Sequence, residues 1–433
     1  MPHNRAGLQA PRVLMLCYYY PPISAAGTHR SVRFAKGLRS IGWEPIILTV
    51  VQSRTPWEHS GELNVFGVRT ERSHEWNLLG FTLLLTGALN RLCDLLRIRR
   101  RPLLLYNLLV PDPQIAWLST WRGARLARNC DCVYVSCSPF SSALSGCLIK
   151  LLARKPLILD FRDAWSLNPH SNESRVRRWL IAKLERVAVS ICDTLILNTA
   201  GAERLYKERY PAYSHKFTCI PNGFDWFTGQ APAATSGKFT IMHVGDFYRS
   251  RTPDRLLDAL ANIRDPRVEF VQVGPMFQSY ERYREKLSIR VIDRVPHRQA
   301  LELMGTASLL YLAQGFEHGV TEYIAVASKT YEYLATGIPI LADCPPGDNA
   351  DLIRRYGPNS YVITTASAGE IEVAVREALA RPRGATTTPN PEFLQSFNGE
   401  TLTARLALVL ANAARLSEGV PGPAPSESGR AVV

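Results

Sequence analysis

Cysteine patterns that build metal or disulfide sites are missing from this chain. Its nine cysteines are spread over 433 residues without a C-x-x-C pair, and no group of histidines completes a zinc site. An odd number of cysteines without framework spacing predicts free, mostly buried thiols in a reducing compartment. We therefore expect a cytoplasmic protein that holds neither structural zinc nor a disulfide framework.

Long hydrophobic runs are also missing. The first residues are polar, so we expect no signal peptide. The longest apolar stretch, residues 78–89, is too short to span a bilayer. It leads into a basic cluster formed by Arg91, Arg97, Arg99, Arg100 and Arg101. This pattern is typical of a helix that lies on an anionic membrane surface, here the inner face, but equally of a core-packed helix with a solvated end. The sequence leaves both open.

Acidic residues are scarce relative to basic ones. The chain has 51 lysines and arginines against 38 aspartates and glutamates, which gives a net charge of +13. This excess favours anionic partners such as phosphates, nucleic acid or acidic lipid. Because the basic residues are scattered and no recognition motif for nucleic acid is present, we expect no nucleic-acid partner.

Short apolar runs alternate with helical patterns in two successive series. Residues 13–17 and 46–50 are predicted strands on either side of a helix over 31–40, which forms a β-loop-α-β unit. The series restarts with a strand at 239–244. Because 433 residues exceed one hydrophobic core, we predict an α/β fold of two Rossmann-like parallel β/α/β domains that face a cleft.

The same pattern suggests the domain boundaries. We predict a first domain at 12–215, a second at 216–390, and a C-terminal helix at 391–416 that crosses back to the first domain. Residues 417–433 are rich in Pro, Gly and Ser and are predicted to be a disordered tail.

The first candidate site is the turn between the first strand and helix. Small residues at Ala26 and Gly27 would let a ligand approach the backbone, and the helix N-terminus that follows favours a phosphate. Only Gly27 of the dinucleotide-binding glycines is present, and no acidic residue ends the second strand. A nicotinamide-dependent dehydrogenase is therefore disfavoured. An ordinary strand-to-helix turn is the alternative.

The second candidate is the segment DFRDAW at the end of a predicted strand. The carboxylates of Asp160 and Asp163 flank Arg162, and such groups could hold the hydroxyls of a sugar. A structural ion-pair network explains them equally well.

Two further candidates lie in the second half. Gly245 ends a strand, and Arg251 stands before a helix, closer to its start than Arg249 does. Lys329 lies at another helix N-terminus, with Glu332 one turn later on the same face. Cations beside helix amides form a diphosphate site, and a carboxylate there suits ribose hydroxyls. The alternatives are a solvated basic loop and a solvated Lys–Glu pair.

Taken in order, five segments resemble the retaining glycosyltransferases of the large family 4 group, which have the two-domain GT-B fold. They are the loop YYPP…G…R with the helix to SIGWEPIILT, then DFRDAW, IPNGFD, VGDFY and KTYEYLATGIPIL. The resemblance covers roughly residues 12–380, and the variant KTYEYLATG is similar to a subgroup that acts in bacterial surface polysaccharide pathways.

The resemblance implies an N-terminal acceptor-binding domain and a C-terminal domain that binds a nucleoside-diphosphate sugar. The acceptor would be a glycan or a lipid-linked glycan, and transfer would retain the anomeric configuration. No metal is expected, because the D-x-D motif of the other glycosyltransferase fold is not evident. The implied donor residues are Gly27, Asn222, Gly245, Arg251, Lys329 and Glu332; those on the acceptor side are Ala26, Arg30, Asp160 and Arg162; those with catalytic roles are Asp163, Arg251 and Lys329.

The chain departs from the family pattern in several places. Glu332 matches the second Glu of the E-x7-E motif, but the first falls at Ile324, with Glu322 the nearest carboxylate. Asp246 stands where an arginine is common, and Ser138 lies in the loop where an acceptor-side histidine is often found. Two other functions therefore stay open: a nucleotide-sugar epimerase of the same fold, and a non-catalytic partner subunit.

Overall fold

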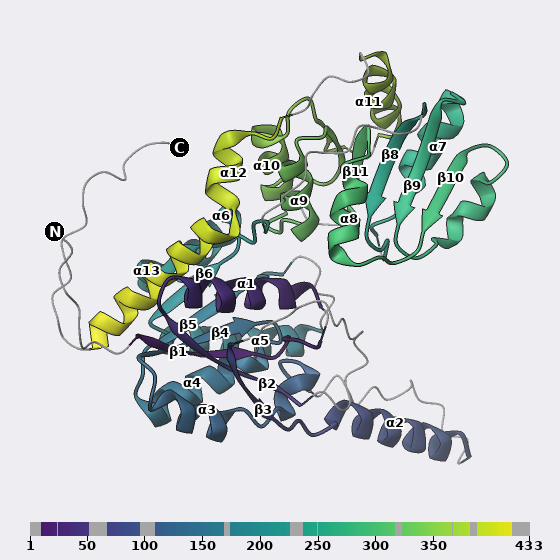
Figure 1. The fold of residues 1–433 in the computed structure, drawn as a ribbon. Helices are drawn as coiled ribbons and strands as arrows, with labels where there is room; N and C mark the ends of the chain where they lie inside the picture. The colour runs from purple at the N-terminus through teal and green to yellow at the C-terminus, as the bar shows by residue number, and fades with distance from the viewer. Residues whose placement is uncertain are drawn as a thin grey trace, which may run out of the picture.

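A computed structural model describes the chain as two α/β domains (Figure 1). The described residues are 10–23, 25–51, 67–95, 109–168, 174–225, 237–248, 250–316, 323–365, 367–381 and 388–417. Within them, both sheets are entirely parallel, with strand orders β3-β2-β1-β4-β5-β6-β7 and β10-β9-β8-β11-β12-β13. Each order reverses beside its first strand, as in doubly wound folds. The predicted fold class is confirmed.

The first sheet is built from short apolar strands that are buried on both faces, as β1 and β4 show. Its strands are β1 (Arg12–Cys17), β2 (Glu44–Val50), β3 (Arg69–Ser73), β4 (Cys132–Cys137), β5 (Leu157–Phe161), β6 (Thr194–Leu197) and β7 (Phe217–Cys219). β7 lies beyond residue 215, so this sheet extends past the predicted domain boundary.

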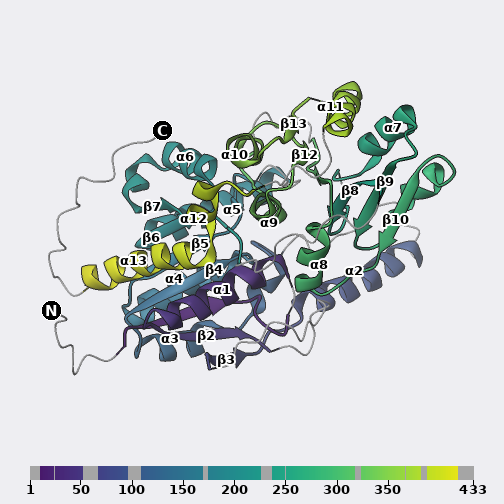
Figure 2. The same cartoon turned by 45° about the horizontal axis from the view of Figure 1, so that its top comes forward.

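Helices cover both faces of the first sheet. One face packs against α1 (Ala26–Ser40) and the C-terminal helix α13 (Gly399–Ser417). The other packs against α3 (Thr120–Ala127), α4 (Ser141–Ala153) and α5 (Arg175–Ile191). The remaining helices of this half are α2 (Leu78–Leu95), η2 (Pro113–Ala116), α6 (Ala200–Arg209) and η3 (Pro211–Lys216). Figures 1 and 2 show α2 projecting from this domain. Among the described helices, none combines the length and the hydrophobicity that a bilayer span requires.

The second domain repeats this plan. Its strands are β8 (Phe239–Val244), β9 (Val268–Val273), β10 (Ser288–Ile292), β11 (Leu309–Ala313), β12 (Ile340–Asp343) and β13 (Tyr361–Ile363). Its helices are α7 (Asp254–Ile263), η4 (Gln278–Tyr283), α8 (His297–Met304), α9 (Ser328–Thr336), α10 (Asp348–Tyr356), α11 (Ala368–Ala380) and α12 (Pro391–Phe397). Two apolar clusters lie on its sheet, one on each face.

The last two helices belong to different domains. Phe393 of α12 is buried in the core of the second domain, whereas Leu402, Leu406 and Leu410 of α13 are buried in the first. The helices α1 and α13 approach closely, since a Cβ on Gly37 would lie 2.6 Å from the Thr403 hydroxyl. The C-terminal helix therefore spans back to the first domain. It includes Ser417, and the rest of the predicted tail, 418–433, lies outside the described residues.

Candidate functional site

The carboxyl ends of β8 and β11 meet at the point where the order of the second sheet reverses. Parallel sheets bind ligands at such points. Gly245 follows β8 with φ +112°, a backbone conformation that favours glycine. A Cβ at this position would lie 2.8 Å from the Lys329 ammonium. Gly245 therefore provides both the turn and the space in which Lys329 lies.

Lys329 contacts a histidine near the carboxyl end of β8. Its Nζ lies 3.1 Å from Nε2 of His243, and Nδ1 of His243 lies 2.9 Å from the Tyr311 carbonyl oxygen. A neutral His243 with its proton on Nδ1 satisfies both contacts, because Nδ1–H donates to the carbonyl and Nε2 accepts from the ammonium. Burial, reinforced by the charge of Lys329, holds the pKa of His243 well below its usual value.

The helix α9 places this lysine at its amino end. Ala327 caps the helix without a side-chain hydrogen bond among the described residues. The Thr330 amide donates to the Ala327 carbonyl oxygen at 2.9 Å, and the amides of Ser328 and Lys329 have no partner in the described part of the chain. Burial, and then the nearby charge of Arg251, lowers the pKa of Lys329 to about 8. A bound anion would relieve both effects, so the site favours a phosphate.

Two arginines stand beside the Gly245 turn. Arg251 donates to the Tyr248 hydroxyl at 2.6 Å, and its guanidinium lies 5.0 Å from the centre of that ring. Asp246, found where the family often has an arginine, forms an ion pair with Arg294 at 2.6 Å. Arg294 thus places a guanidinium next to Asp246, the position at which this chain lacks the arginine that is common in the family. No local motif marked it, because it lies 48 residues away along the chain.

Glu332 lies one turn beyond Lys329 and remains partly exposed, with 24% of its side chain accessible. Its carboxylate is 3.4 Å from Nε2 of His297 on α8. Burial raises its pKa, while His297 opposes that shift. The His297 ring lies 5.0 Å from the ring of His29 on α1, so this part of the second domain faces the first.

Arg33 on α1 ties the first domain to the segment between the domains. It donates to Oδ1 of Asp225 at 2.5 Å and to the carbonyl oxygens of Asn222 and Gly223. Its charge also opposes the rise that burial causes in the pKa of Glu332. The predicted residue Asn222 therefore lies at the domain junction. Its carbonyl oxygen contacts Arg33, whose charge also acts on Glu332.

The turn after β1 becomes helical earlier than predicted, since α1 begins at Ala26. Gly27 therefore lies in the first helical turn, and a Cβ on it would overlap the Arg162 guanidinium. Arg162 donates to the Ser138 carbonyl oxygen at 2.5 Å. Asp163 is exposed and forms no hydrogen bond or ion pair in the part of the chain that the structure describes. The structure therefore brings Gly27, Arg162 and the loop after β4 together.

Arg30 and Asp160 form a buried ion pair. Nε and Nη2 of Arg30 contact the two carboxylate oxygens at 2.8 and 3.0 Å, and the side chains are 3% and 0% exposed. Arg30 also donates to the carbonyl oxygens of Ile220 and Pro221. These contacts fasten the inter-domain segment to α1 and β5, and they leave almost no surface of either side chain for a sugar.

Ile324, at the position of the first motif Glu, packs into the apolar cluster of the first domain. Its carbonyl oxygen accepts from Oγ1 of Thr199 at 2.7 Å. Beside it, both carboxylate oxygens of Asp348 accept from the amide of Gly201 at 3.1 Å. The departure from the motif is thus a contact between the domains. Glu322 lies outside the described residues.

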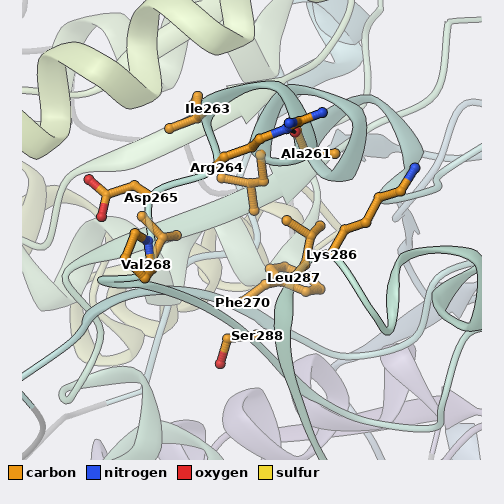
Figure 3. Close-up of a pocket in the computed structure, with 11 residues that line it drawn as sticks. Ala261, Ile263, Arg264, Asp265, Val268, Phe270, Lys286, Leu287 and Ser288 are labelled. Atoms are coloured by element: carbon orange, nitrogen blue, oxygen red, sulfur yellow. Dashed lines mark hydrogen bonds between the residues drawn. The ribbon is translucent and has the colours of Figure 1, made fainter.

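One hollow lies beside these contacts, and another lies within the second domain. One, of about 1000 Å³, lies between α1 and the α12–α13 corner, and its lining includes His29, Arg33 and Asp225. The other, of about 470 Å³, lies at the amino ends of β9 and β10, with Lys286 on its wall (Figure 3). The second hollow lies at the edge of the sheet opposite to Gly245. Among the described residues, no group of three or more His, Cys, Asp or Glu side chains could hold a metal ion. The nine cysteines are free thiols, seven of them buried.

Comparison with known proteins agrees with this arrangement. Residues 27–223 match the family model of the glycosyl transferase 4-like domain. Curated proteins give no match by sequence. Similar solved structures include HepE from Anabaena in complex with UDP and glucose, with 15% identity, a TM-score of 0.61, and coverage of 93% of this chain and 100% of that one. A glycosyltransferase from Rickettsia africae has 12% identity and a TM-score of 0.63, with coverage of 94% and 99%. The lipopolysaccharide outer core galactosyltransferase WaaB has 11% identity and a TM-score of 0.57, with coverage of 94% and 99%.

The two parallel domains and these likenesses define a GT-B fold. Residues 27–223 form a glycosyl transferase 4-like domain, and the chain is a glycosyltransferase.

Proposed function

We propose that the protein transfers a sugar from a nucleoside diphosphate to an acceptor hydroxyl, with retention of configuration. The observation that carries the proposal is the placement of Lys329 at the open amino end of α9, over Gly245 and beside Arg251. Glu332 follows on the same helix, where its carboxylate could accept from ribose hydroxyls. The binding of UDP and UDP-glucose by the similarly folded HepE supports a nucleotide sugar as donor.

The proposed chemistry is electrostatic. When the glycosidic bond to the diphosphate breaks, negative charge grows on the leaving oxygen. Lys329, Arg251 and the first amides of α9 would stabilise this charge, and fixed cations and dipoles are most effective where water is partly excluded. In this scheme Asp163 acts at the reacting centre from the first domain, and no metal ion is required.

The acceptor is proposed to be a glycan or a lipid-linked glycan of a bacterial surface polysaccharide pathway. Ala26 and Arg162, beside the start of α1, are the proposed acceptor-side contacts. Arg30 and Asp160 would act indirectly, by fixing the inter-domain segment. The exposed apolar side chains Phe81 and Leu84 on α2 support a peripheral association with the cytoplasmic face of a membrane.

The test is the release of nucleoside diphosphate from a panel of nucleotide sugars, with and without candidate glycan acceptors. We expect Lys329→Met to lower kcat/KM by about 10²- to 10³-fold for the preferred donor, as for the loss of one charge-stabilising donor. Lys286→Met, at the opposite edge of the same sheet, is the matched control and should have little effect.

The remaining functions predict other results. Interconversion of the donor sugar without transfer to any acceptor would favour an epimerase. Failure of the wild type to turn over any donor would favour a non-catalytic subunit. Loss of activity in chelator, restored only by a divalent metal, would contradict the metal-free scheme.

A further inference from the structure

The helices α3, α4 and α5 form a layer on the first sheet, opposite to α1 and α13 (Figure 1). Neighbouring helices of the layer pack against each other. Their outer surfaces expose large apolar side chains: Trp121, Leu148, Leu151, Val176, Trp179 and Val187. Trp121 is 80% exposed and Val176 is 69% exposed. Large apolar surfaces of this kind mark places where a partner or a membrane is bound.

The charge of the same layer is almost entirely positive. The three helices contain eight lysines and arginines, and their one acidic residue is Glu185. Glu185 is fully buried, and its carboxylate accepts from the hydroxyls of Ser166, Tyr206 and Tyr210 at 2.6–2.7 Å. It therefore does not neutralise the outer surface, on which Lys183 and Arg186 are exposed.

We propose that the outer surface of α3, α4 and α5 docks on an anionic lipid bilayer. Apolar side chains interleaved with arginine and lysine match the boundary between lipid headgroups and acyl chains. A second copy of the chain fits this surface poorly. A two-fold interface would place the surface against itself, and its helices offer no exposed acid to pair with the arginines.

The placement of this surface has a functional consequence. The loop after β4 leads directly into α4, and Arg162 and Asp163 follow β5 in the stretch that precedes α5. A bilayer against the helical layer would therefore adjoin the proposed acceptor side of the first domain. The inference uses only the exposed surface and does not rest on the proposed transfer reaction.

The test is flotation of the full chain with vesicles of phosphatidylcholine alone or mixed with phosphatidylglycerol. We expect binding to the anionic vesicles and much less to the neutral ones. Val176→Ser with Trp179→Ser should weaken binding at least tenfold, and so should Arg175→Ser with Arg186→Ser. Both sets change exposed side chains, so the variants should fold, which their unfolding temperatures will check.

Matched controls change similar side chains elsewhere. Leu408→Ser on α13 alters an apolar residue that is 65% exposed, and Arg284→Ser with Arg298→Ser alters two exposed arginines of the second domain. These controls should bind vesicles as the wild type does.

Three results would overturn the inference. The first is an absence of wild-type binding to anionic vesicles. The second is full binding by both α5 variants, with binding lost only when Phe81 and Leu84 of α2 are changed to serine. The third is a wild-type dimer in light scattering that the α5 variants convert to monomers, which would make this surface an interface between copies. A donor-induced thermal shift should be unchanged in these variants, so failure here is distinguishable from failure of the proposed transferase function.

Discussion

Lys329 and His243 are in contact in the candidate site, and the pKa of each is lowered. The lysine is partly buried next to another cation, and its neutral histidine neighbour accepts one of its three N–H groups. Two N–H groups remain for a ligand. The ammonium group of Lys329 therefore lies beside the Gly245 turn, and its pKa of about 8 is close to physiological pH.

This pair predicts a pH dependence of donor binding. With a pKa of about 8, Lys329 is charged below pH 8 and neutral above it. Because a diphosphate binds the charged form, affinity should be full below pH 8 and fall as the pH rises. Between pH 7 and pH 9 the Kd of a nucleoside diphosphate, measured by calorimetry, should increase about tenfold. Lys329→Met should bind weakly at both values. A wild-type Kd that does not change over this range would contradict the role of Lys329.

At the scale of elements, the spacing of residues within one helix was readable from the sequence, whereas contacts between distant segments were not. Lys329 and Glu332 share a face of α9, as their separation of three residues indicated. The pairs Asp246–Arg294 and Arg30–Asp160 join residues 48 and 130 positions apart, and a single sequence carries no local signal for them.

The same distinction applies to the strands and helices. The buried apolar run at 239–244 was predicted with the observed bounds of β8, and the runs at 13–17 and 46–50 lie within β1 and β2. The edge strand β10 was missed, because its SIRVI pattern is partly exposed and its Arg290 pairs with Glu269 of β9. The beginning of α1 was also placed too late, since Gly27 and Thr28 are weak helix formers whose helical turn is fixed by tertiary contacts.

The buried ion pair between α1 and β5 predicts a large loss of stability when one partner is removed. Arg30→Met would leave the buried Asp160 carboxylate without its cation, although the Tyr134 hydroxyl would still donate to it. It would also free the Ile220 and Pro221 carbonyls. We expect the free energy of unfolding, measured with urea, to fall by about 3–5 kcal/mol. Arg298→Met, which breaks an exposed pair on α8, should leave it nearly unchanged. A similar small effect for both variants would show that the Arg30 pair does not hold the domain junction.

At the scale of the whole molecule, the two domains are joined by more than the connecting segment. Ile324 packs into the apolar core of the first domain. The Asp348 carboxylate accepts a hydrogen bond from the Gly201 amide of α6. Arg33 holds the inter-domain segment from α1. The position that would carry the first motif Glu therefore contributes to domain association in this chain.

Restoring the first motif Glu at position 324 should therefore destabilise this protein. Ile324→Glu would place a carboxylate in an apolar contact, so we expect a loss of about 2–4 kcal/mol in unfolding free energy and no gain in donor affinity. Ile324→Val is the control and should cost about 1 kcal/mol. Unfolding curves and donor titrations on the same samples measure both quantities. Tighter donor binding by Ile324→Glu at unchanged stability would show that this residue lies in the donor site.

We expect a nucleotide sugar to bind where α9 meets the carboxyl edge of the second sheet. The most direct measurement is a thermal-shift panel of nucleoside-diphosphate sugars on the wild type and on Glu332→Ala. One donor should stabilise the wild type, and this shift in unfolding temperature should be largely lost in the variant. An equal shift in both proteins, or no shift with any donor, would contradict this expectation.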